Sequence, residues 1–240
     1  MQRYFIREDA INYPYVEIKG NDLHHIKNVM RYKLNKSVII NTYNGLIYQA
    51  KIIEINNNFI KLEIIKKIEN NFSPLNLDIG LSLIKKDKFE LALKKMTELG
   101  INGIYPLKTE FSIIKIKDAY KKKARYESIC KESSEQTHRN ILPKIYDFQK
   151  LSDIDLSKYH NLLFAYVKEQ KNSFISCLDN IDLLKKTLFL IGPEGGFSDK
   201  EANYLLEKGF TAVSLGNTIL RAETAAIYVT SIFRFKMGEI

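Results

Sequence analysis

The sequence predicts an α/β protein with a parallel sheet flanked by helices, preceded by a smaller domain that is mostly β. Two observations predict this class. From residue 75 onward, apolar runs of strand length alternate with helical patterns, which is typical of βαβ units and hence of parallel strands. Before residue 69, short alternating segments are separated by turn signals, which is typical of antiparallel strands. The polar residues 69–74 separate the two patterns, so we predict domains at 1–72 and 73–240.

The N-terminal domain is expected to be a small β-barrel. Residues 37–43 and 46–53 flank an Asn-Gly pair, which is the strongest short signal for a β-hairpin. Residues 60–64 alternate apolar and charged side chains, as a half-buried strand does. Residues 21–31 place apolar side chains on one face and predict a short helix.

The second domain begins with a complete βαβ pattern. An alternating strand at 75–83 is followed by a helix that Asp87 is expected to cap, with Glu90 three residues on, and by a strand at 101–105. The remaining predicted elements are a long helix at 117–139, a strand at 162–167, a helix at 174–186, a strand at 187–191 and a C-terminal helix from Ile219.

Two glycine-bearing segments near the C-terminus mark a candidate ligand site. The strand at 187–191 runs into the breaker cluster 192–196, where no strand or helix continues. A capping box that begins at Ser198 then starts a helix, and the strand at 210–215 ends in Gly216. Because the carboxyl ends of parallel strands share one edge of a sheet, we expect the two loops to lie side by side and to bind a ligand.

The alternative interpretation of these segments is a pair of ordinary turns. A single Gly-Gly pair after a strand is more often a plain turn than a site, so the prediction depends on both segments together. Neither segment matches GxGxxG or the P-loop pattern GxxxxGK[ST]. A nucleotide-dependent dehydrogenase or an NTPase is therefore not indicated.

Composition limits the partner and the compartment. The chain has 240 residues, with 37 Lys and Arg against 28 Asp and Glu, and its formal charge of +9 favours an anionic partner such as nucleic acid. The two cysteines lack CxxC spacing, so neither a zinc site nor a disulfide framework is indicated. No apolar stretch approaches about 18 residues and the N-terminus has no apolar signal region, so we expect a cytoplasmic protein with no membrane partner.

The two segments, GPEGGFS at 192–198 and SLGNTILRAETAA at 214–226, resemble the signature of the ribosomal RNA small subunit methyltransferase E family of SPOUT-class RNA methyltransferases. The likeness extends over nearly the whole chain. It implies a SPOUT-type, trefoil-knotted fold with a PUA-like N-terminal barrel, S-adenosylmethionine as the cofactor without a metal, and a homodimer. It also implies methylation of N3 of a specific uridine in 16S rRNA within the 30S subunit.

The resemblance places cofactor contacts in the two glycine-bearing segments and catalysis beside them. Glu194, Arg221 and Glu223 are the candidate catalytic residues, because a cation favours a uracil that has lost its N3 proton and a carboxylate can accept that proton. An ion pair between Glu194 and Arg221 that pins the loops together is the alternative. The expected cofactor-binding residues are Gly192, Pro193, Glu194, Gly195, Gly196, Leu215, Gly216, Ile219, Leu220, Thr224 and Ala225.

RNA contacts are expected at basic and polar positions of both domains. The stretch from His25 to Asn35 resembles the family element H-x-x-x-V-L-R-x-x-x-G, with Met30 for Leu and Asn35 for Gly, while Phe111 stands where the family has arginine. A solvated basic surface, or a histidine bonded within the fold, is the alternative for such positions. The expected RNA-binding residues are Arg7, His25, Arg31, Lys85, Lys88, Arg125, Gln136 and Arg139.

Two other functions remain open from the sequence. A SPOUT methyltransferase acting on transfer RNA or on 23S rRNA would share the same motifs. A non-catalytic RNA-binding module would have the basic surface and the barrel, but it would have no reason for paired glycine loops and would give no calorimetric signal with S-adenosylmethionine.

Overall fold

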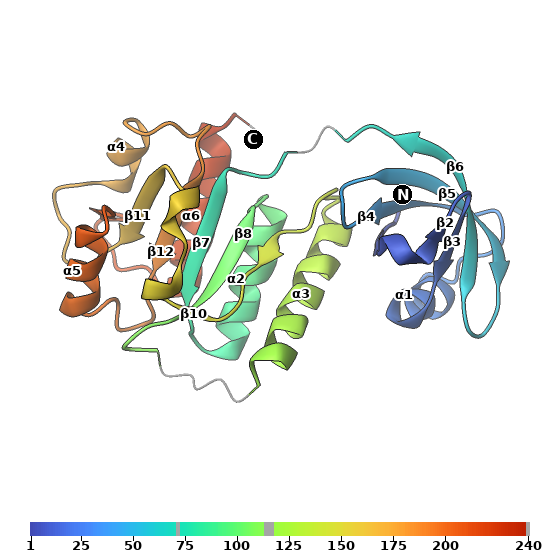
Figure 1. Cartoon of the computed structure of the whole chain (residues 1–240), viewed down its shortest axis with the longest axis horizontal. Coiled ribbons are helices and arrows are strands. Elements are labelled where there is room, and N and C mark those ends of the chain that lie inside the picture. Colours follow the sequence, from blue (N-terminus) through green and yellow to red (C-terminus); the bar gives the residue numbers. More distant parts are fainter. Residues whose placement is uncertain (71–72, 113–117, 239–240) are drawn as a thin grey trace. The chain divides into compact units, whose positions relative to one another are not determined.

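The structure is a computed structural model that describes residues 1–70, 73–112 and 118–238. The chain, coloured along its sequence in Figure 1, forms two compact units. Unit 1 contains Met1–Ser73 and Lys131–Leu142, and unit 2 contains Pro74–Cys130 and Pro143–Ile240. The predicted division at residue 72 does not include the second segment of unit 1, because nothing local in that segment shows which domain it contacts.

Unit 1 is built on a six-stranded, mostly antiparallel sheet. The strands are β1 (Arg3–Ile6), β2 (Ile11–Asn12), β3 (Tyr15–Ile18), β4 (Ser37–Thr42), β5 (Ile47–Ile55) and β6 (Ile60–Ile68). They lie in the order β1-β4-β5-β6-β3-β2; the β1–β4 pair is parallel and the other pairs are antiparallel. The sheet curls around a core that includes the buried side chains of Val16, Ile40 and Leu62. The predicted β-rich N-terminal domain and its hairpin are confirmed.

A short helix precedes β4. The α1 helix (Gly20–His24) continues into a π-helical turn at His25–Val29, and Ile26 is fully buried there. Two residues with positive φ follow, Arg31 at 52° and Asn35 at 67°. Asparagine adopts positive φ more readily than most residues, so Asn35 holds the turn for which the family element carries glycine.

Unit 2 is built on a parallel sheet. Its strands are β7 (Leu77–Ser82), β8 (Gly103–Lys108), β9 (Lys144–Ile145), β10 (Gln149–Lys150), β11 (Asn161–Ala165), β12 (Thr187–Ile191) and β13 (Thr211–Val213). They lie in the order β10-β8-β7-β12-β11-β13, with β9 also on β8, and every pair is parallel. The predicted parallel sheet is confirmed. The strands that lead into the two glycine-bearing loops, β12 and β13, are not paired with each other, because β11 lies between them. The trefoil knot implied by the resemblance stays a prediction.

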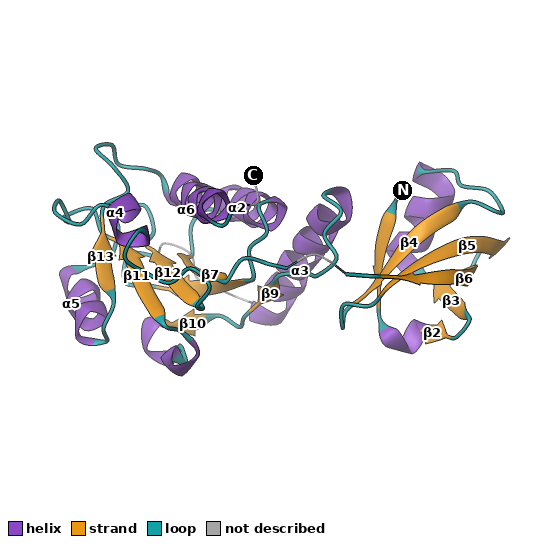
Figure 2. Ribbon diagram, turned by 90° about the horizontal axis from the view of Figure 1, so that it is seen from above, coloured by secondary structure: helices purple, strands orange, loops and turns teal. Residues whose placement is uncertain are grey.

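Helices cover both faces of this sheet, as Figure 2 shows. They are α2 (Lys86–Glu98), α3 (Ala119–Gln136), α4 (Phe174–Leu178), α5 (Asp199–Glu207) and α6 (Ala222–Lys236). On one face α2, α4 and α6 contribute Phe89, Phe174 and Phe233 to a single core. On the other face Leu205 of α5 packs in a second core with Phe164 of β11. Across the described ranges, no helix combines the length and hydrophobicity that a bilayer-spanning segment needs.

Four of these helices have bounds that differ from the prediction. The C-terminal helix α6 begins at Ala222 rather than at Ile219, with Arg221 as its N-cap residue. Lys85 rather than Asp87 is the N-cap residue of α2. Asp87 lies in the first turn, where its negative charge interacts favourably with the positive end of the helix dipole. The α4 helix ends at Leu178 rather than near residue 186, and there the Asn180 side chain donates to the Ser176 carbonyl at 2.8 Å. The α3 helix ends at Gln136 rather than at residue 139, and residue 117, its predicted start, lies outside the described residues.

The N-terminus of α5 has the capping box that the sequence predicts. The Ser198 hydroxyl accepts from the Glu201 amide at 3.2 Å and donates to Glu110 at 2.6 Å, while the Glu201 carboxylate accepts from the Ser198 amide at 3.0 Å. We expect Ser198→Ala to lower the free energy of unfolding by about 1–2 kcal/mol in urea denaturation. The exposed Ser152→Ala should change it by less than about 0.5 kcal/mol, and an equal effect of the two changes would contradict the capping role.

Candidate functional site

Three strand ends of unit 2 surround a cavity of about 620 Å³. The strands are β11, β12 and β13, and the first turn of α6 completes the lining. Because the strands are parallel, their carboxyl ends meet at one edge, which is where open α/β sheets bind ligands. Small-molecule sites have volumes of about 300–1,000 Å³, so this cavity has the size of such a site.

Most of the predicted cofactor residues line this cavity. From the first segment these are Gly192, Pro193, Glu194 and Gly196, and from the second Leu215, Gly216, Ile219, Leu220 and Ala225. Gly195 and Thr224 are not among the lining residues. Contact with a cofactor stays a prediction for each of them.

Glycine is needed in both segments for different reasons. A Cβ on Gly192 would lie 2.8 Å from the backbone of Gly196, so the first loop folds tightly onto itself. The Gly196 amide donates to the Pro193 carbonyl at 2.8 Å across this turn. Gly216 has a φ of 129° and no atom within 4 Å of where its Cβ would stand, so its backbone borders open space.

Main-chain groups of the second loop are available to a ligand. In the described part of the chain, the amides of residues 217–220 donate to no other residue. The Leu215, Ile219 and Leu220 side chains add an apolar surface to the same lining. A site of this kind can hold an apolar ring and hydrogen-bond its polar edge with main-chain groups.

No cofactor residue was predicted in the loop that follows β11. Tyr166, Val167, Glu169 and Gln170 line the cavity, because β11 lies between β12 and β13. The Tyr166 hydroxyl donates to Asp199 at 2.9 Å and its amide donates to the Val213 carbonyl at 3.0 Å, which anchors the loop on α5 and β13. The signal for these residues was a third strand whose carboxyl end reaches the same edge.

Two of the three candidate catalytic residues line the cavity. Glu194 and Arg221 are exposed, and neither side chain has a hydrogen bond or ion pair with another described residue, so the alternative of an ion pair between them is not observed. Glu223 is buried instead, and its carboxylate lies 3.8 Å from the Lys88 ammonium. Within the ranges that the structure describes, no group of three or more His, Cys, Asp or Glu is placed to hold a metal ion.

Comparison with known proteins places the chain in a family. A family model described as RNA methyltransferase domain matches residues 71–234, and one described as RNA methyltransferase PUA domain matches residues 18–65. Ribosomal RNA small subunit methyltransferase E of Bacillus subtilis is 32% identical, over 98% of this chain and 97% of its own length. The protein of that name from Mesomycoplasma hyopneumoniae is 34% identical, over 95% of this chain and 97% of its own. The chain belongs to the ribosomal RNA small subunit methyltransferase E family.

Solved structures of similar proteins agree with this family and with the SPOUT-type fold. The Neisseria gonorrhoeae ribosomal RNA small subunit methyltransferase E, bound to S-adenosylmethionine, is 26% identical with a TM-score of 0.85 and 98% of each chain covered. A putative methyltransferase from Legionella pneumophila, in complex with the same cofactor, is 26% identical with a TM-score of 0.86, covering 98% of this chain and 97% of its own. The predicted α/β fold with a PUA-like domain is confirmed.

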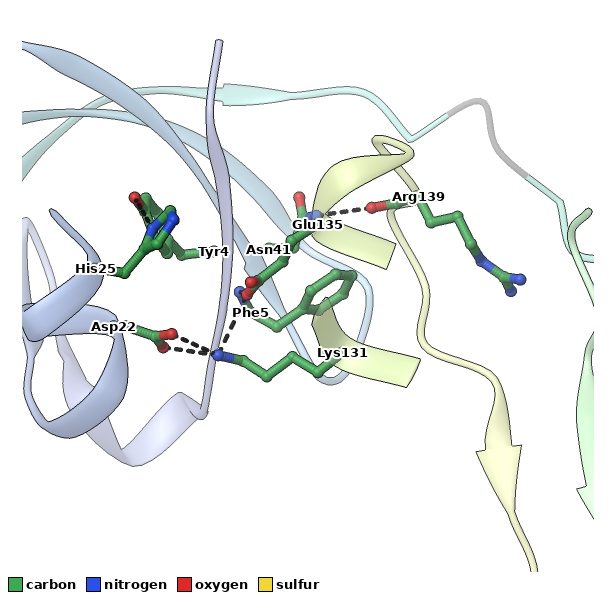
Figure 3. A network of polar contacts seen from close by, with 8 residues as sticks. All are labelled: Tyr4, Phe5, Asp22, His25, Asn41, Lys131, Glu135 and Arg139. Atoms are coloured by element: carbon green, nitrogen blue, oxygen red, sulfur yellow. Dashed lines mark hydrogen bonds and ion pairs between the residues drawn. The ribbon is translucent and has the colours of Figure 1, made fainter. Parts of the chain in front are cut away.

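In this member of the ribosomal RNA small subunit methyltransferase E family, His25 is bonded within unit 1. Its Nδ1 lies 3.0 Å from the hydroxyl of Tyr4, as drawn in Figure 3. Burial raises the pKa of Tyr4, so the phenol keeps its proton, and the tautomer of His25 decides which of the two groups donates. The Nε2 side of the half-buried imidazole is the part that remains for an RNA contact.

The part of α3 that belongs to unit 1, from Lys131 onward, is held there by an ion network that the sequence did not predict. The Lys131 ammonium lies 2.7 Å from Asp22 and 3.2 Å from Glu135, and Glu135 also accepts from the Phe5 amide at 2.9 Å (Figure 3). Burial lowers the pKa of Lys131, but the two carboxylates outweigh burial and raise it overall, so the ammonium stays charged.

The other predicted RNA contacts of unit 1 divide by exposure. Arg7, Arg31 and Gln136 are exposed. Arg139 is only 2% exposed; its carbonyl accepts from Asn41 at 3.0 Å and its Nε donates to the Ile141 carbonyl at 3.1 Å. The structure therefore gives Arg139 a role in holding the fold instead of an open surface for RNA.

The predicted RNA contacts of unit 2 are partly neutralised by carboxylates. Lys85 is exposed at the start of α2, whereas Lys88 pairs with the buried Glu223. The Arg125 guanidinium donates to Glu90 at 3.2 Å. Of these three cations, Lys85 alone forms no ion pair with another described residue. Its charge is therefore the most available of the three for a phosphate contact.

Phe111 marks the outer side of the first glycine loop. A Cβ on Gly195 would lie 3.2 Å from the Phe111 Cβ, so the two residues pack together, and Phe111 remains 46% exposed. An arginine at position 111 would place a cation beside the loop, and this chain has an aromatic ring there instead.

Proposed function

We propose that this protein is an S-adenosylmethionine-dependent methyltransferase that methylates N3 of a specific uridine in 16S rRNA of the small ribosomal subunit. The observation that carries the proposal is the cavity at the carboxyl ends of β11, β12 and β13, which both glycine-bearing segments line. Relatives that bear the name ribosomal RNA small subunit methyltransferase E are 32% and 34% identical over nearly the full chain, and one with the same fold is bound to S-adenosylmethionine.

The residues of the cavity fit this cofactor. An adenine ring needs apolar walls and hydrogen bonds at its edge, which Leu215, Ile219 and Leu220 and the available amides of residues 217–220 supply. Gly216 leaves the backbone open to close approach.

The reaction requires that N3 of the uracil lose its proton before it attacks. When bound, S-adenosylmethionine supplies an electrophilic methyl group. We assign to the Arg221 guanidinium the stabilisation of the anionic uracil, since it lines the cavity without a carboxylate partner among the described residues. We assign to the Glu194 carboxylate the acceptance of the N3 proton, because it lines the same cavity. Glu223, buried against Lys88, is a positioning residue for the first turn of α6.

The deciding experiment supplies the cofactor with a labelled methyl group and compares four RNAs. Naked 16S rRNA, 30S subunits lacking the modification, 23S rRNA and transfer RNA are incubated with the protein, and the modified base is mapped by mass spectrometry. We expect label at N3 of one uridine, in 16S rRNA or 30S subunits only. Label in 23S rRNA or transfer RNA would instead support a different SPOUT substrate, and no label together with no calorimetric cofactor signal would support a non-catalytic RNA-binding module.

The same proposal includes a homodimer acting in the cytoplasm on the 30S subunit. The resemblance in sequence implies it, and large apolar side chains that are exposed, such as Ile219 at 80% and Phe235 at 64%, favour the dimer. Light scattering of the purified chain measures the oligomeric state, and a monomer at micromolar concentration would contradict the dimer.

A side chain placed in the lining of the cavity should weaken cofactor binding. We expect Gly216→Leu to raise the cofactor dissociation constant at least tenfold, about 1.4 kcal/mol, by calorimetry, because the new side chain projects from the lining. Gly209→Leu is the matched control, since Gly209 has a φ of 85° and open space at its Cβ but lies outside the cavity. Equal affinities of the two variants would show that the cofactor binds elsewhere.

A further inference from the structure

Unit 1 has a cavity of its own, of about 720 Å³. Its lining comes from β1 and the turn after it, β2, β3, α1, β6, the β4–β5 hairpin and Lys131 of α3. The residues that matter for its chemistry are Phe5, Arg7, Tyr15, Tyr43, Lys61 and Lys131. This set combines aromatic rings with cations, which is the combination that single-stranded nucleic acids require. The lining also contains three carboxylates: Asp22 is paired with Lys131, Glu17 is paired with Lys19, and Asp9 is exposed.

Tyr43 supplies the available aromatic ring. Its side chain is 49% exposed, and the Phe5 ring packs against it edge to face, with centroids 6.4 Å apart, which fixes its orientation. The Tyr15 ring differs, because the Lys61 ammonium covers it at 4.2 Å from the centroid. Tyr43 is therefore the ring of this cavity on which a planar group can stack.

Arg7 supplies the available cation. Its exposed guanidinium has no hydrogen bond or ion pair with another described residue. Lys131, by contrast, is engaged by Asp22 and Glu135. Burial raises the pKa of Tyr43, while the charges of Lys131 and Arg7 act to lower it, so both cations lie close enough to influence the phenol.

We infer that this cavity binds one unstacked nucleotide of single-stranded RNA, with the base on the Tyr43 ring and the phosphate on the Arg7 guanidinium. Sequence-specific proteins recognise single-stranded RNA by splaying out bases, stacking them on aromatic side chains and hydrogen-bonding their edges. The exposed Asn12 amide in the lining offers a donor and an acceptor to such an edge. The choice of RNA as the polymer rests on the proposed function.

The test measures fluorescence anisotropy of the full chain with two labelled oligonucleotides, hexauridylate and an abasic hexamer that keeps the sugars and phosphates. We expect Tyr43→Ala to weaken hexauridylate binding about 5- to 150-fold and to leave the abasic hexamer unaffected, because only stacking is lost. Tyr43→Phe should retain the wild-type affinity. We expect Arg7→Gln to weaken both oligonucleotides, since a phosphate contact does not depend on the base.

Two matched controls separate the cavity from general surface effects. Tyr120→Ala removes a tyrosine that is 83% exposed outside the cavity, and Lys67→Gln removes an exposed positive charge outside it. The inference would be overturned if Tyr43→Ala bound hexauridylate within twofold of the wild-type affinity. It would also be overturned if Arg7→Gln lowered the affinity for hexauridylate no more than Lys67→Gln does. Methyl transfer does not enter this measurement, so a failed methylation assay and a failed nucleotide pocket are distinguishable.

Discussion

Replacing Asp78 by alanine is expected to lower the free energy of unfolding by about 3–5 kcal/mol. The carboxylate of Asp78, on β7, is completely buried. It accepts hydrogen bonds from Asn102 at 2.5 Å, Tyr159 at 2.6 Å and Tyr146 at 3.1 Å, and it lies 3.3 Å from the ammonium of Lys186. Removal of the carboxylate leaves all four donors without their acceptor, three of them neutral and one charged.

The surrounding tyrosines make this loss larger than that of one isolated bond. The Tyr105 and Tyr159 hydroxyls lie 2.8 Å apart, and the Tyr105 and Tyr146 rings stack at 3.7 Å. Burial, and after it the Asp78 charge, raises the pKa of Tyr159, so the phenol keeps its proton and remains a donor. Neutral hydrogen-bond donors from several segments therefore stabilise the buried carboxylate of Asp78 inside the sheet.

Urea denaturation of Asp78→Ala measures the loss. The control is Asp147→Ala, which removes a carboxylate that is 79% exposed and 2.7 Å from Lys123, and which should cost less than about 1 kcal/mol. Asp78→Asn should fall between the two, because the amide oxygen still accepts hydrogen bonds. A loss below 1 kcal/mol for Asp78→Ala would show that the network contributes little.

The strands and loops of unit 2 follow from local sequence signals. The run at 187–191 is a strand because it is apolar and ends in breakers, and α5 begins at its capping box. Asp78 shows the limit of such patterns. Its place in an alternating strand predicts an outward polar side chain, yet the strand is covered on both faces and the carboxylate is buried.

The lining of the cavity was only partly predictable, because strand order is a long-range property. The two glycine segments were found from local breakers, but β11 pairs with both β12 and β13 and brings Tyr166 and Glu169 to the site. No local pattern specifies that insertion, since sequential strands are neighbours only in the majority of cases.

Charged residues were the least predictable part. A basic position in a sequence does not show whether its partner is RNA or a carboxylate of the same chain. Lys88 pairs with Glu223, and Arg139 is buried, although both resembled exposed cations in the sequence. Arg7 and Arg221 are exposed whereas Lys88 is paired and Arg139 is buried, and this difference comes from the surrounding fold, not from the local sequence.

Under the proposed function, Arg221→Gln is expected to lower kcat/KM for RNA methylation by about 10²- to 10³-fold. The guanidinium lines the cavity from the N-cap position of α6 and has no carboxylate partner among the described residues, so its charge is available to the anionic uracil. Glutamine keeps a donor but removes the charge, which raises the N3 pKa of the bound uracil. The calorimetric affinity for S-adenosylmethionine should change only a few-fold, because this role concerns the RNA base.

The pH profile of Arg221→Gln separates this role from a structural one. Because a cation favours the deprotonated base, its loss shifts the rate toward higher pH, and the deficit relative to the wild type should shrink as pH rises. Lysine at position 221 keeps a charge and should restore part of the rate. The control Lys200→Gln removes an exposed charge of α5 outside the cavity and should leave the profile unchanged. If the loss of kcat/KM were constant with pH, or smaller than tenfold, Arg221 would only hold the loop in place. Other groups would then have to promote the removal of the N3 proton.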